Sequence, residues 1–304
     1  MSQNGEGTLS VVLVTGSSSG IGLAAALYLG RKGYEVYASL RNPESAPELT
    51  QTIAKEKLPV TPIRVDVNNE TSVRSGVAEV HRKAGQIDVL VNNAGRGGVG
   101  AIEAVSIEDA KEIFETNYFG AIRMVQAVLP FMRERRQGTI VMVTSIAGRL
   151  ASAGQGQYAA SKHALEAASE ILAKEVRPFN IRVAIVEPGV ILTPIFAKGR
   201  DSAESRSPNP IAEHYADPVR RLLTFFQTQL LNPTIPEAVA EAIEHAVTTD
   251  QPRLRYVVGE DARLLLAGYQ RTTDEERVED GRPMTDDEYY DLMRERHGTD
   301  LFRP

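Results

Sequence analysis

The chain of 304 residues contains no cysteine, which excludes disulfide bonds, thiolate nucleophiles, iron–sulfur clusters and cysteine zinc sites. It has no apolar run approaching the roughly 20 residues needed to cross a bilayer. Its polar start, Met1 to Gly7, lacks the basic and apolar regions of a signal peptide. A basic excess is also missing, because the formal charge is −6, which argues against a nucleic-acid binder. These absences predict a cytoplasmic protein without a membrane span.

Hydrophobic residues make up 42% of the chain and charged residues 24%, a balance typical of globular proteins rather than disordered or fibrous ones. The length alone favours about two domains. The charge is unevenly placed: residues 271–304 hold eleven acidic and six basic residues, and so carry −5 of the total −6. We expect 271–304 to be an acidic tail that is draped over the surface or mobile.

The first 190 residues alternate short β-branched runs with longer amphipathic segments. The apolar runs predict strands at 10–14, 34–39, 60–65, 87–91, 139–144 and 181–186. Helices are expected between them, including a long one over about 106–135, with Ser106 as its N-cap. Near-continuous apolar strands that alternate with helices are typical of a parallel sheet covered on both faces. The sequence therefore predicts an α/β fold with a doubly wound, Rossmann-type sheet of about seven strands.

The pattern changes after Gly189. Residues 191–236 are rich in proline, serine and charge, with one helical stretch around 217–231; a helix at 236–247 and a strand at 255–258 follow. One domain with an insertion at about 194–236 explains this better than two domains, and the insertion is expected to cover a substrate. Its apolar side chains predict a lipophilic pocket: Phe196, Tyr215, Leu222, Leu223, Phe225 and Phe226.

A glycine-rich turn, Thr15-Gly-Ser-Ser-Ser-Gly-Ile-Gly22, stands between the first strand and the first helix. Glycines at 16, 20 and 22 allow a tight turn and close approach of the backbone to a pyrophosphate. The helix N-terminus behind the turn favours anions. The alternative is a Gly/Ser-rich connector without a ligand. The spacing is GxxxGxG rather than the GxGxxG of the usual dinucleotide fingerprint.

Further motifs follow in order: Asn92-Asn-Ala-Gly95 after the fourth strand, Asn117 in the long helix, Ser145 after the fifth strand, Tyr158-Ala-Ala-Ser-Lys162, and Pro188-Gly189 after the sixth strand. Together with the glycine turn, they resemble the classical short-chain dehydrogenase/reductase family over about residues 8–195. The segment Val36 to Arg41 is most similar to the hydroxysteroid and retinol dehydrogenase branch. The resemblance implies a Rossmann-fold catalytic domain over residues 8–270.

The resemblance implies that Ser145, Tyr158, Lys162 and Asn117 are catalytic. Tyr158 and Lys162 lie four residues apart and so share a helix face. A nearby ammonium favours the phenolate and lowers the tyrosine's pKa from about 10, which lets Tyr158 act as general acid or base. Ser145 would hold the substrate oxygen beside Tyr158, although a serine after a strand can also be a turn residue. Asn117 would hold a water that links the lysine to solvent, although an interior helical asparagine can instead bond the backbone.

The resemblance also implies a nicotinamide dinucleotide. Leu40 stands where NAD-using relatives carry an acid, and Arg41 follows; a guanidinium can bond a 2′-phosphate, so NADP(H) is favoured over NAD(H). Arg41 as a solvated loop residue is the alternative. Asp66 would bond the adenine and Val67 pack on its ring, or Asp66 caps a turn. The other cofactor-binding candidates are Gly16, Ser17, Ser18, Ser19, Gly20, Ile21, Gly22, Asn93, Ala94, Gly95, Tyr158, Lys162, Pro188, Gly189, Ile191 and Thr193.

These residues predict an NADP(H)-dependent oxidoreductase that interconverts a ketone or aldehyde with an alcohol, on a steroid-, retinoid- or long-chain-like substrate. A 3-oxoacyl-thioester reductase and a non-catalytic dinucleotide sensor are the alternatives. Five scattered histidines without ligand spacing predict no metal site. A homodimer or homotetramer is expected through apolar stripes on two helices, unless the stripes pack on their own sheet. The stripes are Met124, Val128 and Phe131, with Ala164, Leu165 and Ala168.

Overall fold

The computed structural model describes residues 3–4, 8–194 and 210–303. Seven parallel strands form its main sheet, in the order β5-β4-β3-β6-β7-β8-β9. They are β3 (Val11–Thr15), β4 (Glu35–Leu40), β5 (Val60–Arg64), β6 (Val89–Asn92), β7 (Gly138–Val143), β8 (Ile181–Pro188) and β9 (Arg255–Val258). A short antiparallel pair, β1 (Gln3–Asn4) and β2 (Thr8–Leu9), precedes them. The predicted parallel α/β sheet is confirmed.

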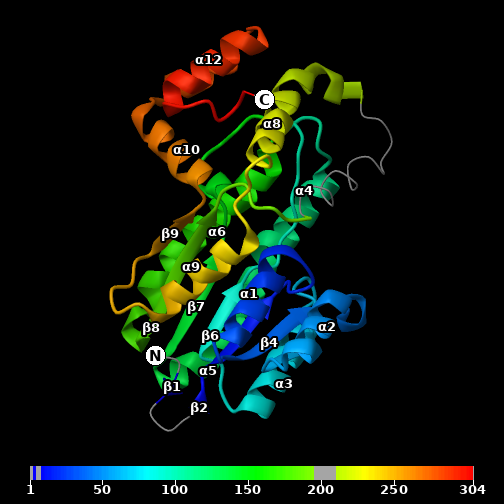
Figure 1. The fold of residues 1–304 in the computed structure, drawn as a ribbon, viewed down its shortest axis with the longest axis vertical. Helices are drawn as coiled ribbons and strands as arrows, with labels where there is room; N and C mark the ends of the chain where they lie inside the picture. Colours follow the sequence, from blue (N-terminus) through cyan, green and yellow to red (C-terminus); the bar gives the residue numbers. More distant parts are fainter. Residues whose placement is uncertain (1–2, 5–7, 195–209, 304) are drawn as a thin grey trace.

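Helices follow most strands (Figure 1). The described α-helices are α1 (Gly20–Arg31), α2 (Pro47–Glu56), α3 (Glu70–Ala84), α4 (Ile107–Phe114), α5 (Gly120–Arg135), α6 (Gly156–Val176), α8 (Ala216–Gln229), α9 (Pro236–Thr248), α10 (Glu260–Arg271), α11 (Asp274–Glu279) and α12 (Asp286–His297). Short 3-10 turns are η1 (Pro43–Ser45), η3 (Ile146–Gly148), η4 (Arg177–Phe179) and η5 (Pro210–Tyr215), and η2 (Glu115–Phe119) is a π-helix.

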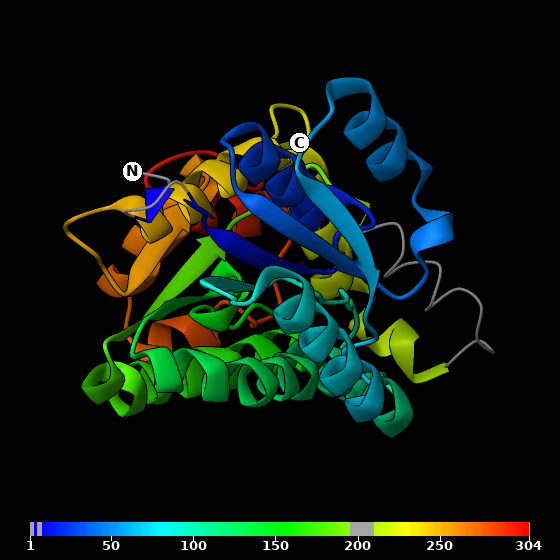
Figure 2. The ribbon, with the colours of Figure 1, turned by 90° about the horizontal axis from the view of Figure 1, so that it is seen from below.

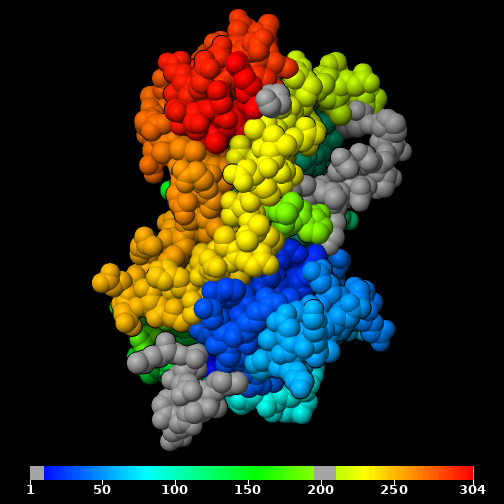
Figure 3. Space-filling view, in the orientation of Figure 1, coloured from blue at the N-terminus to red at the C-terminus, as the bar shows by residue number. Residues whose placement is uncertain are grey.

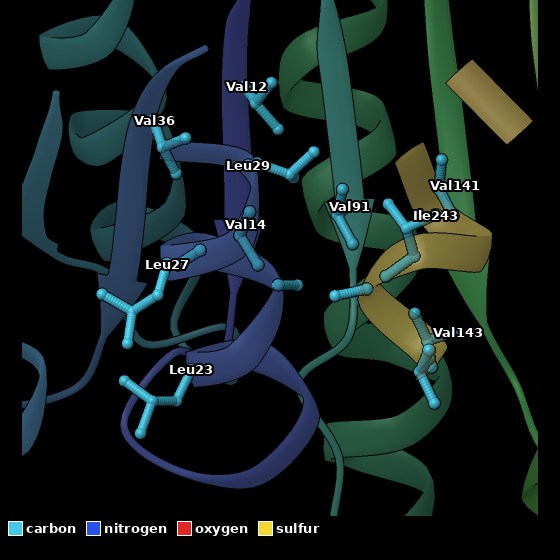
Figure 4. Packing of buried hydrophobic residues seen from close by; sticks show 14 of the residues in the cluster. Val12, Val14, Leu23, Leu27, Leu29, Val36, Val91, Val141, Val143 and Ile243 are labelled. Carbon is cyan, nitrogen blue, oxygen red and sulfur yellow. The ribbon is translucent and has the colours of Figure 1, made fainter. Parts of the chain in front are cut away.

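Two helical layers cover the sheet, as Figure 2 shows. Successive side chains of a strand point to opposite faces, so on β3 Val12 and Val14 face the layer of α1, α2 and α9, while Val11 and Leu13 face that of α3, α5 and α6. All four are at most 1% exposed. Figure 4 shows Val12 and Val14 beside side chains of α1, while Ile243 of α9 lies beside Val141 and Val143 of β7 in the same cluster. Burial on both faces explains why the central strands are largely apolar.

The strand order reverses between β3 and β6. From β3 the chain continues to β4 and β5 on one side, and β6 to β9 extend the sheet on the other. The loops that leave the carboxyl ends of β3 and β6 therefore diverge, which opens a crevice where doubly wound folds bind ligands. This topology positions the glycine turn and the segment after Asn92 next to each other.

The long predicted helix is interrupted. A single helix over about 106–135 is wrong, because the π-helix η2 separates α4 from α5 and contains Asn117. The predicted N-cap is confirmed: the Ser106 hydroxyl accepts a hydrogen bond from Asp109 N at 3.1 Å. A π segment breaks the regular helical register and is often found at functional sites.

The C-terminal segment is folded onto the domain. The sequence analysis predicted no helices after residue 271, yet α11 and α12 form there, each begun by a capping box: Thr273 with Glu276, and Thr285 with Glu288. Leu301 is buried with residues of α8 and α10 in a third apolar cluster beyond the sheet. Figures 1 and 3 show α8, α10 and α12 gathered at this end of the molecule.

The apolar stripes on α5 and α6 pack largely within the chain. Met124, Val128 and Leu165 are at most 2% exposed and belong to the core cluster on their own sheet. Packing on the chain's own sheet, the alternative explanation, therefore accounts for these three. Among the residues that the structure describes, no helix is both long and apolar enough to cross a membrane.

Candidate active site

The glycine turn after β3 lies against the loop after β6. Gly16 has a φ of +72°, and a Cβ there would lie 2.8 Å from Ala94 Cα. A Cβ on Gly22 would lie 2.3 Å from Gly16 O and 2.4 Å from Asn93 Nδ2. Gly20 meets the segment after β8, where its Cβ would lie 3.0 Å from Thr193 Cγ2. Side chains at these glycines would fill the space between the loops, so the turn is a backbone-lined cradle.

Thr15 holds this arrangement, and the sequence analysis did not single out its side chain. Its hydroxyl accepts hydrogen bonds from Asn93 N (2.9 Å) and Ala94 N (3.0 Å) and donates to Val91 O (3.3 Å). Asn93 Nδ2 donates in return to Thr15 O at 2.9 Å. Thr15 and Asn93 therefore fix the two loops at the switch point. The only sequence signal for Thr15 is its position directly before the glycine turn.

One cavity of about 1030 Å³ runs from this cradle to the C-terminal helices. Most of the predicted cofactor residues line it: Gly16, Ser18, Ser19, Gly20, Ile21, Arg41, Asp66, Val67, Asn93, Ala94, Gly95, Tyr158, Lys162, Pro188, Gly189, Ile191 and Thr193. Three features fit a dinucleotide whose phosphates lie at the N-terminus of α1. The glycines bring the backbone close to the cavity, α1 begins there, and Arg41 supplies a cation. The residues present therefore suit the cofactor that the sequence predicted.

Two predicted cofactor residues do not face this cavity. Ser17 is fully buried, and its hydroxyl donates to Val14 O at 3.1 Å, so it is turned inward rather than toward a phosphate. Gly22 lies beneath the turn, where it allows the close packing of α1. Asp66 lines the cavity and also caps a turn, because its Oδ1 accepts from Asn68 N at 3.0 Å.

Ser145, Tyr158 and Lys162 line the cavity together, with Ser145 and Lys162 both close to Tyr158. Ser145 follows β7, and its hydroxyl accepts from Ala147 N at 3.1 Å. Tyr158 and Lys162 lie one turn apart near the start of α6. The Lys162 Nζ donates to Val143 O at 3.1 Å and lies 5.9 Å from the centroid of the Tyr158 ring. The structure therefore brings the three predicted catalytic side chains together.

Burial dominates the electrostatics of this trio. It raises the pKa of the Tyr158 phenol, an effect that the Ser145 hydroxyl opposes. It also lowers the pKa of Lys162 to about 8, while the nearby Glu166 acts in the opposite direction. The predicted lowering of the tyrosine's pKa by the ammonium is thus outweighed by desolvation in this structure. At neutral pH Lys162 remains mainly charged.

Asn117 connects the trio's helix to the loop after β6. Its side chain is 1% exposed, donates to Ser161 Oγ on α6 and to Arg96 O, each at 3.0 Å, and accepts from Arg96 N at 2.8 Å. A Cβ on Gly95 would lie 3.2 Å from Asn117 Oδ1 and 3.8 Å from Lys162 Nζ. The side chain of Asn117 therefore hydrogen-bonds the backbone, as the alternative interpretation predicted. Asn117 lies in the π-helix η2, beside Lys162.

Beyond Tyr158 the cavity becomes an apolar chamber. Leu222, Phe225 and Phe226 of α8 line it as predicted, together with residues of η3 and α10. Two other predicted pocket residues do not: Tyr215 directs its hydroxyl to Glu103 Oε2 at 2.5 Å, and Leu223 is 38% exposed. Phe196 lies outside the described residues.

The sequence analysis missed the chamber's outer wall and one carboxylate. Residues of the supposed tail line the chamber, among them Arg277, Tyr289, Met293 and Phe302. Asp261 accepts a hydrogen bond from Val190 N at 2.7 Å and so holds the segment after β8. The two Thr-x-x-Glu capping boxes are the sequence signal that could have predicted the helices of this wall. No sequence signal points to Asp261.

The chain belongs to the short-chain dehydrogenase/reductase family, because the family model described as short chain dehydrogenase matches residues 10–204. It is 38% identical to 3-ketodihydrosphingosine reductase of Bacteroides thetaiotaomicron over 84% of this chain and 90% of the relative. It is also 38% identical to human retinol dehydrogenase 8, over 80% and 79% of the two chains. A short-chain dehydrogenase from Streptomyces avermitilis matches its fold with a TM-score of 0.74 at 35% identity, over 91% and 96%.

These matches confirm the predicted family and its retinol dehydrogenase branch. The chain is therefore an oxidoreductase of the dehydrogenase/reductase type, a family that uses NAD(P).

Proposed function

We propose that the protein is an NADP(H)-dependent oxidoreductase that interconverts a lipophilic ketone or aldehyde with the corresponding alcohol. One observation carries this proposal. Ser145, Tyr158 and Lys162 lie in a single cavity, between a backbone cradle for phosphates and an apolar chamber. A carbonyl carbon that enters from the chamber reaches the trio beside the place where the nicotinamide end of a dinucleotide would lie.

The chain's own residues supply placement and proton transfer. When bound, the dinucleotide provides or accepts the hydride. Ser145 holds the substrate oxygen within reach of Tyr158 and stabilises its developing charge. Tyr158 gives its Oη proton to that oxygen during reduction and takes one during oxidation. Lys162 stabilises the phenolate that remains, because its ammonium lies on the same side of α6.

The preference for NADP(H) rests on the end of β4. Leu40 is buried there and carries no charge, and the exposed Arg41 follows at the edge of the cavity. A carboxylate at this place would repel a 2′-phosphate, whereas a guanidinium bonds it through paired donors. Ser18 and Ser19 line the same end of the cavity.

The substrate class rests on the chamber. Leu222, Phe225 and Phe226 are 5–7% exposed and form an apolar wall with residues of α10 and the C-terminal segment. An apolar wall of this kind favours substrates with a large hydrocarbon body. Human retinol dehydrogenase 8 and the 3-ketodihydrosphingosine reductase, to which this chain is similar, are named for molecules of that kind.

The proposal is tested by NADPH oxidation across a panel of a long-chain ketone, a steroid ketone, retinal, a small polar ketone and a 3-oxoacyl thioester. We expect the lipophilic carbonyls to give the highest kcat/KM. Tyr158→Phe should lower kcat by about a thousandfold and leave NADPH binding intact, as measured by fluorescence titration. Tyr28→Phe, on α1 outside the cavity, is the control.

Other results of these assays would favour a different function or overturn the proposal. Best turnover of the thioester would favour the 3-oxoacyl-thioester reductase. Binding of NADPH without turnover of any carbonyl would favour the dinucleotide sensor. Full activity of Tyr158→Phe, or no dinucleotide binding at all, would overturn the proposal.

A further inference from the structure

A cluster of buried charges lies directly behind the catalytic lysine. Glu166 of α6 and Glu187 of β8 are 4% and 0% exposed. Arg255 of β9 lies between them, with Nη2 3.0 Å from Glu166 Oε2 and Nε 3.0 Å from Glu187 Oε1. Arg149, after η3, adds a bond to Glu187 Oε1 at 3.0 Å. Neither the proposed reaction nor the cofactor cradle uses these four side chains.

The cluster is one turn from Lys162. Glu166 follows Lys162 by four residues and therefore lies on the same face of α6. The η3 turn closes this side of the helix, since a Cβ on Gly148 would lie 2.8 Å from Glu166 Cγ and 3.1 Å from Lys162 O. Oε1 of Glu166 and Oε2 of Glu187 have no hydrogen-bond donor among the described residues. Both carboxylates are thus incompletely satisfied by the arginines.

Lys162 is a further buried cation next to the cluster. Glu170, half exposed on α6, is the third carboxylate bound to Arg255. The two buried carboxylates, Glu166 and Glu187, face the guanidiniums of Arg149 and Arg255, and each keeps one oxygen without a donor among the described residues. A buried carboxylate that is incompletely bonded is stabilised by a further cation close by. Lys162, 5% exposed, is the cation that α6 places there.

We propose that Glu166 is the counter-ion of Lys162, a positioning residue that keeps the buried amine protonated during turnover. The inference rests on the proposed function, because the ammonium matters only if Lys162 supports the Tyr158 phenolate. Arg255 in turn favours the charged form of Glu166, and Thr144, directly after β7, contributes a hydroxyl beside Glu166.

The directions of the pKa shifts agree with this arrangement. Burial lowers the pKa of Lys162 to about 8 and Glu166 raises it. Burial raises the pKa of Glu166, the Glu187 charge adds to that rise, and Arg255 opposes it. Lys162 is protonated below pH about 8 and loses its proton as the pH rises through that value. Without the Glu166 charge, the loss would occur at lower pH.

The test is the pH profile of carbonyl reduction by the NADPH-loaded enzyme. In the wild type, kcat/KM should fall as the pH rises through about 8. In Glu166→Gln, we expect this fall to move to lower pH by about one to two units, the size of shift that loss of a nearby opposite charge produces. The 13Cε resonance of Lys162 in the dinucleotide-free protein, assigned with Lys162→Arg, should titrate at correspondingly lower pH.

Glu170→Gln is the matched control, because it removes another carboxylate from Arg255 on the same helix. Its profile should stay within about 0.3 units of the wild type, since exposed charges are strongly screened. Glu166→Asp, which keeps the charge, should restore most of the profile. If Glu166→Gln does not fold, Glu166→Met replaces it, and loss of the carboxylate should again move the fall in activity to lower pH.

Two results would overturn the proposed counter-ion role of Glu166. One is a pH profile and a Lys162 resonance that do not shift in Glu166→Gln, and the other is an equal shift in Glu170→Gln. An unshifted or upward-shifted profile in Glu166→Met would do the same. These outcomes are distinct from failure of the proposed function, which Tyr158→Phe decides: an enzyme that needs Tyr158 but whose pH profile ignores Glu166 keeps the function and loses only this inference.

Discussion

Arg41 is the residue at which the choice between two dinucleotides can be tested most directly. We expect the wild type to show a higher kcat/KM with NADPH than with NADH. Arg41→Ala should lower kcat/KM with NADPH by about ten- to hundredfold, because a hydrogen bond to a charged group contributes about 1.5–3 kcal/mol. The value with NADH should change little. Steady-state kinetics with both cofactors measures the ratio.

Arg64 offers a control for this substitution. It ends β5 beside Leu40 of β4, is exposed and does not line the cavity. Arg64→Ala should leave the cofactor ratio unchanged. A wild-type enzyme that prefers NADH, or an Arg41→Ala variant with an unchanged ratio, would contradict the assignment of Arg41.

Single residues also show which features of the site a sequence motif does not predict. The motif places Ser17, Ser18 and Ser19 together in the turn, but only the backbone path decides that the Ser17 hydroxyl points inward to Val14 O. Asn117 could be assigned to the site from its position, whereas its bonds to Arg96 depend on a loop that no local pattern defines.

At the scale of elements, ion pairs between α8 and α12 connect two walls of the apolar chamber. Asp286, in the first turn of α12, bonds Arg221 Nε at 3.0 Å and also pairs with Arg220. We expect Asp286→Asn to loosen this contact and to raise KM for a long apolar ketone by about tenfold, or about 1.4 kcal/mol. NADPH affinity, measured by fluorescence titration, should remain that of the wild type.

Asp291→Asn tests whether the effect is specific. Asp291 lies on α12 as well and pairs with Arg294 and Arg303, but it does not contact α8 or the cavity. It should leave KM unchanged. Equal KM values for the wild type and Asp286→Asn would show that α12 does not support the substrate chamber.

The sequence predicted elements well where burial imposes a pattern and poorly where it does not. The strands β3, β4, β6, β7 and β8 are largely apolar because both faces are covered, so their apolar runs can be recognised in the sequence. The helices α11 and α12 are polar on most sides, with Tyr290 and Met293 as the buried positions of α12. Such a segment lacks a clear apolar stripe, so composition alone favoured a tail.

At the scale of the whole molecule, Asp88 joins three parts of the domain at the sheet edge opposite the site. Its carboxylate, 8% exposed, accepts from Val11 N at 2.8 Å, Gln86 Nε2 at 3.0 Å and Arg135 Nη2 at 3.1 Å. We expect Asp88→Ala to lower the free energy of unfolding by about 3 kcal/mol, because it removes the carboxylate partner of the partly buried Arg135 and leaves the N–H of Val11 unpaired. Urea unfolding measures this change.

An exposed pair provides the comparison. Glu79 and Lys83 on α3 are about two-fifths exposed, so Glu79→Ala should cost less than about 0.5 kcal/mol. Asp88→Ala should keep the wild-type kcat/KM at temperatures where it is folded, because no Asp88 atom lines the cavity. A loss of stability no greater than that of Glu79→Ala would contradict the role given to Asp88.

The predicted homodimer or homotetramer and the cytoplasmic location stay predictions. Burial of Met124, Val128 and Leu165 within the chain leaves Phe131, Ala164 and Ala168 as the partly exposed members of the stripes.

The walls of the substrate chamber come from widely separated parts of the chain, from Ile146 of η3 to Phe302 near the last residue. The seven strands and the glycine cradle, by contrast, are complete once Val258 has been added. The strands and the cradle therefore come from a part of the sequence that is separate from the segment after Val258, which contributes the outer wall of the chamber. Substitutions in that later segment can change the outer wall without changing any strand of the sheet or any glycine of the cradle.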